Sequence, residues 1–497
     1  MTPSSVPALL LMLLHLSSPT GGAPRPTPAL LAWQLNDTGC IVHYNMATAA
    51  NTQGCRSDTG DEAPPPLSAW RPTVLDTDAW ADACKAMGGS RIILTAKHNC
   101  GFLLWHSSAV PNYTYTTQKS QPDVVDAFVA SARRAGLGVG FYYSDWTNSY
   151  CRVCKGQVVL GPPRSGQVAV TQAAYDAIVV AHLTELWSKF GVLAEIWFDG
   201  GLRRELWPTV RALLARLQPE AVVFGGLGFS PNSVRFTGNE NGAPPFPMWS
   251  TTDAAPSAPA NGNPKGSVWA PPESPWTLQA VDSWFYSQSG GVHPPEQLVE
   301  MYEASTGSNA AALIDIAPYA NGSLPAEQAA AASALGEFVQ GCYGASGSAV
   351  ASGAGTLNNL TIRPTGGHST AAVDRIQLRE DQSQGGQRVR VRRSIVLSTM
   401  CNNPLLLMIR ISNEPTVHRH SRSLPCWPTA RVLPCATAGM TGLEAGRTQP
   451  SPSATSSSAD SKHRSPSGAS PSPSRPPLME RRLRSRNSLH SVACRCW

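Results

Sequence analysis

The sequence lacks several features that would assign it to common protein classes. After its N-terminal region it has no apolar run long enough to cross a bilayer, so we expect a soluble product with no membrane partner. No glycine-rich phosphate-binding motif follows the first predicted strand, which disfavours a nucleotide-binding fold. The formal net charge is +6, but arginine concentrates toward the C-terminus, near residues 388–393 and 480–486, and is not spread over the predicted barrel. We therefore expect no nucleic-acid partner.

The N-terminus and the cysteines indicate the secretory pathway. Residues 1–23 are typical of a signal peptide, because a short apolar segment is followed by small residues. Four N-x-S/T sequons and 12 cysteines fit an oxidising compartment. The C-x-x-C pair of Cys151 and Cys154 predicts a local disulfide, since no second C-x-x-C lies at zinc-finger spacing. We expect a secreted protein, or one of a lysosome- or vacuole-like compartment.

Short apolar runs alternate with helical patterns over roughly three hundred residues, the size of a barrel domain. Strands are predicted at 40–45, 91–98, 137–145, 194–199, 221–226, 248–251, 282–287 and 311–318. Helices are predicted at 78–87, 122–135, 171–190, 203–217, 295–305 and 325–339. This alternation predicts an α/β fold, a (β/α)8 TIM-like barrel. An open doubly wound sheet is the alternative.

Composition changes divide the chain into parts. We expect the barrel to occupy residues 24–343. Residues 344–397 contain short alternating runs, which predict part of a C-terminal β-sandwich. Residues 398–497 include a Ser/Pro-rich stretch with little to bury, so a low-complexity, disordered tail is predicted there.

The octapeptide A-E-I-W-F-D-G-G at 194–201 ends a predicted buried strand on Asp199. A carboxylate at the rim of a barrel, among aromatic and histidine side chains, is typical of glycoside hydrolases, which use two carboxyl groups. Candidates for the second are Glu240, Glu273 and Asp145, each of which is alternatively a solvated or structural acid. Asp199 itself alternatively caps the next helix. The rim is expected to collect His43, Lys97, His98, Asn99, Tyr142, Trp146, Asp199, Glu240 and Glu273.

Several ordered motifs resemble one known family. They are V-H-Y at 42–44, L-T-A-K-H-N-C-G-F at 94–102, F-Y-Y-S-D-W at 141–146, W-F-D-G at 197–200, W-A-P-P-E at 269–273 and W-F-Y at 284–286. In this order and spacing the sequence resembles the α-L-fucosidases of glycoside hydrolase family 29, most closely the plant-type branch that acts on α-1,3/1,4-linked fucose. The resemblance covers residues from about 39 to 342, with a weaker echo at 374–391.

The resemblance implies roles for individual residues. Asp199 falls on the family's nucleophile, which forms a covalent fucosyl-enzyme intermediate, and Glu240 falls on the acid/base of the plant-type branch. The side chains expected to bind substrate are His43, His98, Asn99, Tyr142, Trp146 and Glu273, the last through rim structure and substrate orientation. No cofactor or metal is implied. We expect Asp199 and Glu240 to stand about 5 to 6 Å apart with substrate bound, and the pKa of Glu240 to be raised.

Two departures and two rival functions accompany this hypothesis. The family's K-H-H-D-G-F is here K-H-N-C-G-F, with Asn99 and Cys100, so charge is lost from the motif and substrate preference is affected more than reaction type. The Glu-Trp pair of many members has only Trp70 as a substitute. One rival is a catalytically impaired glycan-binding barrel. The other is a metal hydrolase using His106 with rim histidines, disfavoured because these histidines show no H-x-H or H-x-x-x-H spacing. Oligomeric state is left open.

Overall fold

The computed structural model describes residues 24–55, 62–255, 259–281 and 283–343. It also describes short segments at 351–352, 355–356, 359–364, 382–383, 385, 397–399 and 407–409. The predicted signal peptide and the Ser/Pro-rich stretch lie outside these residues. Among the described residues, no helix combines the length and apolarity that a membrane crossing requires.

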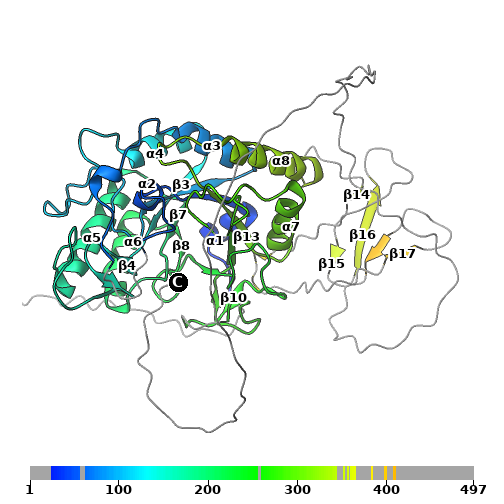
Figure 1. Cartoon of the computed structure of the whole chain (residues 1–497). Helices are drawn as coiled ribbons and strands as arrows, with labels where there is room; N and C mark the ends of the chain where they lie inside the picture. The colour runs from blue at the N-terminus through cyan, green and yellow to red at the C-terminus, as the bar shows by residue number, and fades with distance from the viewer. Residues whose placement is uncertain are drawn as a thin grey trace, which may run out of the picture. The chain divides into compact units, whose positions relative to one another are not determined.

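Eight parallel strands close into a barrel (Figure 1). They are β1 (Thr38–Val42), β2 (Arg91–Lys97), β3 (Gly138–Tyr143), β7 (Glu195–Trp197), β8 (Val222–Phe224), β9 (Ser233–Phe236), β12 (Pro272–Thr277) and β13 (Ala311–Ile316). Each strand pairs with its neighbour in chain order, and β13 closes the ring by pairing with β1. The prediction of a TIM-like barrel is confirmed, and the open doubly wound sheet is excluded.

Helices surround the barrel. They are α1 (Pro28–Leu35), α2 (Met46–Ala49), α3 (Thr77–Ala86), α4 (Val124–Arg134), α5 (Gln172–Lys189), α6 (Trp207–Leu217), α7 (Pro295–Thr306) and α8 (Ala326–Tyr343), with short 3-10 turns η1 (Leu67–Ala69) and η2 (Arg204–Leu206). Several begin at a side-chain cap: Asp76, Asp123 and Thr171 each accept a backbone N–H of the first turn. The helices are thus fixed where the loops above the strands end.

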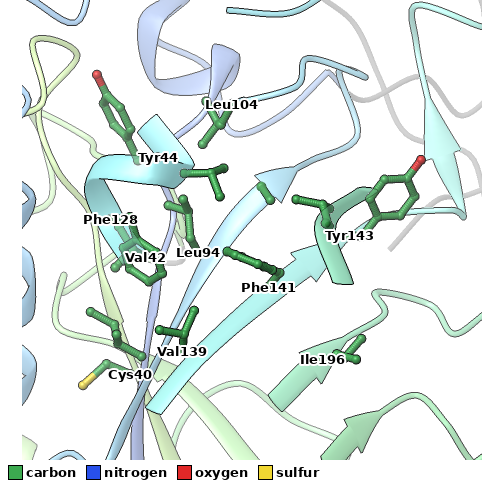
Figure 2. Packing of buried hydrophobic residues seen from close by; sticks show 14 of the residues in the cluster. Cys40, Val42, Tyr44, Leu94, Leu104, Phe128, Val139, Phe141, Tyr143 and Ile196 are labelled. Atoms are coloured by element: carbon green, nitrogen blue, oxygen red, sulfur yellow. The ribbon is translucent and has the colours of Figure 1, made fainter. Parts of the chain in front are cut away.

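Strand alternation separates the packing layer from the barrel interior. Outward side chains of β1 to β3, such as Val42, Leu94 and Phe141, pack with Phe128 of α4, and Figure 2 shows this cluster. The residues between them point inward. Ile41, Ile93, Tyr142 and Leu313 form an interior layer, with Trp197 packed against it. Because side chains alternate, the inward series of β7 is Glu195, Trp197 and then Asp199.

Two predicted barrel strands are wrong. The sixth strand is β9, not 248–251, of which only Thr251 enters the two-stranded sheet of β10 (Thr251–Thr252) and β11 (Val268–Trp269). The seventh is β12, not 282–287. Helix-free connections explain both errors, because no helix separates β8, β9 and β12 in the described residues. In addition, β12 contains two prolines, which disfavour a strand prediction.

Smaller sheets complete the described structure. One contains β4 (Thr147–Asn148), β5 (Val153–Cys154) and β6 (Gln157–Val158). A five-stranded antiparallel sheet contains β14 (Ala351–Ser352), β15 (Gly355–Thr356), β16 (Asn359–Pro364), β17 (Leu397–Thr399) and β18 (Leu407–Ile409). It uses strands on both sides of residue 398, the predicted start of the tail. The runs expected at 376–380 and 388–395 lie outside the described residues.

The disulfides differ from the expected local bridge. Cys40 pairs with Cys84, and Cys55 pairs with Cys100. The predicted bridge between Cys151 and Cys154 is wrong, because Cys151 is a buried thiol. Burial raises the pKa of this thiol to about 12, so it stays protonated. The two bridges present instead join segments 44 and 45 residues apart.

Candidate active site

Asp199 lies where β7 leaves the barrel interior. Phe198 points outward into the helix layer, and Asp199 is the next inward position, only partly buried. The hydroxyl of Tyr142, from β3, donates to Asp199 Oδ2 at 2.7 Å. Burial raises the pKa of Asp199, whereas the Tyr142 hydroxyl, His43 and the Gly200 N–H lower it. Asp199 is therefore a carboxylate held by a neutral donor, with no ion pair neutralising it in the described residues.

The glycines after Asp199 permit close aromatic packing. Gly200 has φ of 69°, and a Cβ there would lie 2.7 Å from Cγ of Trp146. Trp146 comes from the turn after β3 and is partly exposed. The positive φ and the close ring together require glycine at this position. Trp146, predicted to contact substrate, is thereby placed beside the carboxylate.

Two histidines from adjacent strands stand next to each other. His43 follows β1 and His98 follows β2, and their ring centres are 5.8 Å apart. His98 stacks on Tyr142 with centres 5.2 Å apart. His43 Nδ1 lies 2.7 Å from Asp315 Oδ1, an inward carboxyl of β13. Burial lowers the pKa of His43 to about 3 despite the nearby Asp199, so this ring is neutral.

Asn99 supports the pocket through His98. Its Oδ1 accepts the backbone N–H of Cys55 at 3.0 Å and lies 2.8 Å from His98 Nδ1. Because the first donor fixes this atom as oxygen, His98 donates through Nδ1. The disulfide from Cys55 to Cys100 ties the same loop to the motif. Asn99, predicted to bind substrate, thus holds an imidazole and the loop after β1.

Glu240 is on the loop after β9 and is exposed. Its Oε2 accepts a hydrogen bond of 3.1 Å from the indole N–H of Trp284. Trp284 in turn lies against His43, with ring centres 5.0 Å apart. Through Trp284, the second predicted carboxyl reaches the same cluster that holds Asp199. The negative charge of Glu240 also acts on Tyr142, where it helps to raise the pKa.

Glu273 is not at the rim, and that part of the prediction is wrong. It lies near the start of β12, fully buried, and pairs in register with Ala311, the first residue of β13. Its carboxylate accepts from Arg91 at 3.0 Å and from Trp197 at 3.0 Å. Arg91 opens β2, so this group belongs to the N-terminal end of the barrel, opposite Asp199. Burial and nearby Glu195 raise the pKa of Glu273, while Arg91 opposes them.

We call this N-terminal group the barrel floor; its members are Arg91, Glu195, Glu273 and Trp33. Arg91 Nε donates to Glu195 at 2.6 Å, and the Trp33 indole N–H donates to the same carboxylate at 2.8 Å. Trp33 belongs to α1, a helix that the sequence did not predict. The guanidinium also lies 4.7 Å from the centre of the Trp33 ring. The floor is therefore a buried ion cluster covered by α1.

Lys97, predicted at the rim, is buried beneath it. Its ammonium donates to the carbonyls of Ser144 and Thr147, in the turn after β3. Burial lowers the pKa of Lys97 to about 7, and Asp145 and Asp199 act in the opposite direction. Lys97 thus holds the turn that leads to Trp146.

The sequence reasoning missed two side chains that line the histidines. Phe285 packs edge-on against both, with ring centres 5.3 Å from His43 and 4.8 Å from His98. Asp315 was inside the predicted eighth strand, and its signal was an isolated acid in the apolar run A-A-L-I-D-I. A carboxyl at an inward strand position near the rim was therefore visible but not used.

Comparison with known proteins decides the family. A model of the family described as alpha-L-fucosidase matches residues 65–344, more than half of the chain. The chain belongs to this α-L-fucosidase family. Alpha-L-fucosidase 1 of Arabidopsis thaliana is 30% identical over 319 residues, which are 60% of this chain and 57% of that protein. A rice protein, from Oryza sativa subsp. japonica, is 28% identical over 320 residues, 61% of this chain and 56% of that one.

Solved structures of the α-L-fucosidase family agree. A Bacteroides thetaiotaomicron protein assigned as an α-L-fucosidase is 26% identical, with a TM-score of 0.58 over 69% of this chain and 81% of that chain. The fold and the family are thus supported together. The present chain spans a little over half the length of its plant relatives.

Proposed function

We propose that this chain is a retaining exo-glycosidase that hydrolyses terminal α-L-fucose, α-1,3/1,4-linked, from glycoproteins or oligosaccharides. The observation that supports it is the placement of Asp199 at the C-terminal end of the barrel, hydrogen-bonded by Tyr142. Active sites of TIM barrels lie at this end. Glu240, linked through Trp284 to the same aromatic and imidazole cluster, supplies the second carboxyl that glycosidases need.

In the proposed mechanism Asp199 is the nucleophile and Glu240 the acid/base. Tyr142 binds Oδ2 of Asp199, so we assign Oδ1 to attack the anomeric carbon. The bond from this carbon to the leaving oxygen breaks while Glu240 gives that oxygen its proton. Water then attacks the fucosyl-enzyme, loses a proton to Glu240 and releases Asp199. Two displacements at one carbon give net retention.

Substrate binding is assigned to the polar and aromatic groups around Asp199. His43 and His98 offer ring nitrogens to fucose hydroxyls, and Trp146 and Trp284 offer apolar faces to the sugar. The plant relatives, which are named as α-L-fucosidases and match over about 320 residues, support α-L-fucose as the sugar that is released. Two disulfides within the barrel support an oxidising compartment reached by secretion.

The acid/base assignment is tested with azide and an aryl α-L-fucoside. Glu240→Ala is expected to lose about 10²- to 10⁴-fold in hydrolysis of substrates with poor leaving groups. Azide restores turnover because it attacks the fucosyl-enzyme without needing a proton removed. The matched control is Glu273→Ala, which azide does not rescue because Glu273 lies on the barrel floor. Rescue of Glu273→Ala in place of Glu240→Ala would contradict the assignment.

A linkage-defined fucoside panel tests the substrate. The full chain is expected to cleave branched Lewis-type α-1,3/1,4 fucosides faster than α-1,2 or α-1,6 ones. Binding of these sugars with no turnover of any fucoside would instead indicate a glycan-binding barrel.

A further inference from the structure

His43 and Asp315 form a buried pair at the top of the barrel interior. Their strands are neighbours, with Val42 opposite Ile316, and the backbone N–H of His43 donates to the Ile316 carbonyl at 3.1 Å. Nδ1 of His43 and Oδ1 of Asp315 are 2.7 Å apart. The side chains are 6% and 1% exposed, so water does not compete for this contact.

The surroundings favour a pair without net charge. Oδ2 of Asp315 has no hydrogen-bond partner in the described part of the chain, so a full carboxylate there would be poorly stabilised. Asp199, which needs its negative charge as a nucleophile, is the ionisable group that acts on His43 from β7. Burial raises the pKa of Asp315 well above its usual range and lowers that of His43. A second anion beside Asp199 is thus disfavoured.

The number of protons on this pair determines whether Nε2 of His43 is protonated. A proton on Asp315 Oδ2 is disfavoured, because that oxygen has no hydrogen-bond partner in the described part of the chain. With the shared proton on Oδ1 or on His43 Nδ1, a pair without net charge also has a proton on Nε2 of His43. Nε2 has no hydrogen bond to any described residue. His98 differs from His43, because its Nδ1 donates to Asn99 Oδ1.

We propose that Asp315 is a positioning residue that holds His43 as an Nε2–H donor to an oxygen of the bound sugar. This inference rests on the proposed function, since the sugar is the expected fucose. Asp315 acts only through His43.

The experiment uses the full chain with Asp315→Asn and Asp315→Leu. Fucose affinity is measured by calorimetry, and the tautomer of His43 by 15N NMR of histidine-labelled protein without ligand. An asparagine amide that donates to Nδ1 keeps the Nε2–H form, so Asp315→Asn is expected to weaken binding by no more than about threefold. Leucine offers no donor, so Asp315→Leu is expected to weaken binding by about 10- to 100-fold.

The result for asparagine decides the direction of the hydrogen bond. Because an asparagine amide can offer either its NH2 or its oxygen to Nδ1, the tautomer of His43 in this variant is read beside its affinity. An Nδ1–H tautomer in Asp315→Asn with fucose affinity equal to that of the unmodified chain would overturn the proposal. An Nδ1–H tautomer of His43 in the unmodified chain would also overturn it. Glu195→Gln, on the barrel floor, controls for loss of a buried carboxylate, and thermal melting reports the folded fraction of every variant. An unmodified chain with the Nε2–H tautomer that binds no fucose would contradict the proposed function alone.

Discussion

Glu195 and Asp199 point into the same barrel from the two ends of β7. Glu195 is fully buried and accepts from the Arg91 guanidinium and the Trp33 indole. Asp199 is partly exposed and accepts from the Tyr142 hydroxyl, a neutral donor. The floor therefore neutralises its acids with a cation under the cover of α1, whereas the rim acid accepts hydrogen bonds and makes no ion pair in the described residues.

The difference suits the floor to stabilising the fold and the rim to the proposed reaction. A buried carboxylate paired with arginine is neither nucleophilic nor accessible, and removing its partner is costly. A carboxylate held by neutral donors and partly exposed keeps a reactive oxygen. Between them, Trp197 donates to Glu273 of the floor and stacks on Tyr142 at 5.3 Å. Trp197 thus lies between the two ends of the barrel and contacts a residue of each.

The largest effect on activity is expected from replacing Asp199, and its counterpart at the other end of β7 is Glu195. Asp199→Ala is expected to reduce kcat for an aryl α-L-fucoside by at least about 10⁴-fold, because it removes the nucleophile, with little change in melting temperature. Glu195→Gln is expected to do the opposite: a lower melting temperature, and kcat per folded molecule within about threefold. Loss of turnover in folded Glu195→Gln would show that the two ends are not separable.

The next effect concerns the floor cation. Arg91→Met leaves Glu195 and Glu273 buried without their guanidinium, so we expect unfolding free energy to fall by about 3–5 kcal/mol at pH 7. The pKa of Glu273 is already raised by burial, and it rises further without Arg91. A raised pKa in the folded state means stability that decreases as pH rises, so the deficit should shrink toward acidic pH. Urea unfolding at several pH values checks this, and a pH-independent deficit would contradict it.

The smallest effect tests the rim donor. Tyr142→Phe removes the hydroxyl that lowers the pKa of Asp199, so that pKa rises. Because the nucleophile must be ionised, the acidic limb of kcat/KM should move to higher pH. Activity at the optimum should fall by about tenfold, the loss of one hydrogen bond to a charged group. An unchanged acidic limb would show that this hydroxyl does not control Asp199.

Sequence reasoning succeeded where strand and side-chain patterns agree. The apolar runs of β1, β2 and β3 each end on polar residues, so these strands and the positions of His43 and His98 were predictable. Asp199 and Tyr142 were both expected at the rim from the ends of their strands, and the hydroxyl of Tyr142 does donate to Asp199. Whether these residues perform the assigned chemistry stays a prediction.

The failures have physical causes. The strand β9 contains an arginine and β12 contains a glutamate and two prolines, and neither strand is preceded by a helix, so periodicity gives no signal. Glu273 was placed at the rim because the seventh strand was predicted at 282–287, whereas it is β12, which contains Glu273. Asp315 and Arg91 act through partners on distant segments, which one sequence without spatial contacts does not reveal.

The bridge from Cys55 to Cys100 has a consequence for how the pocket matures. It fastens the loop whose N–H orients Asn99, and so His98 is held in part by a covalent bond whose other half lies 45 residues upstream. The position of the His98 imidazole therefore depends on oxidation of Cys55 and Cys100 as well as on folding of the chain.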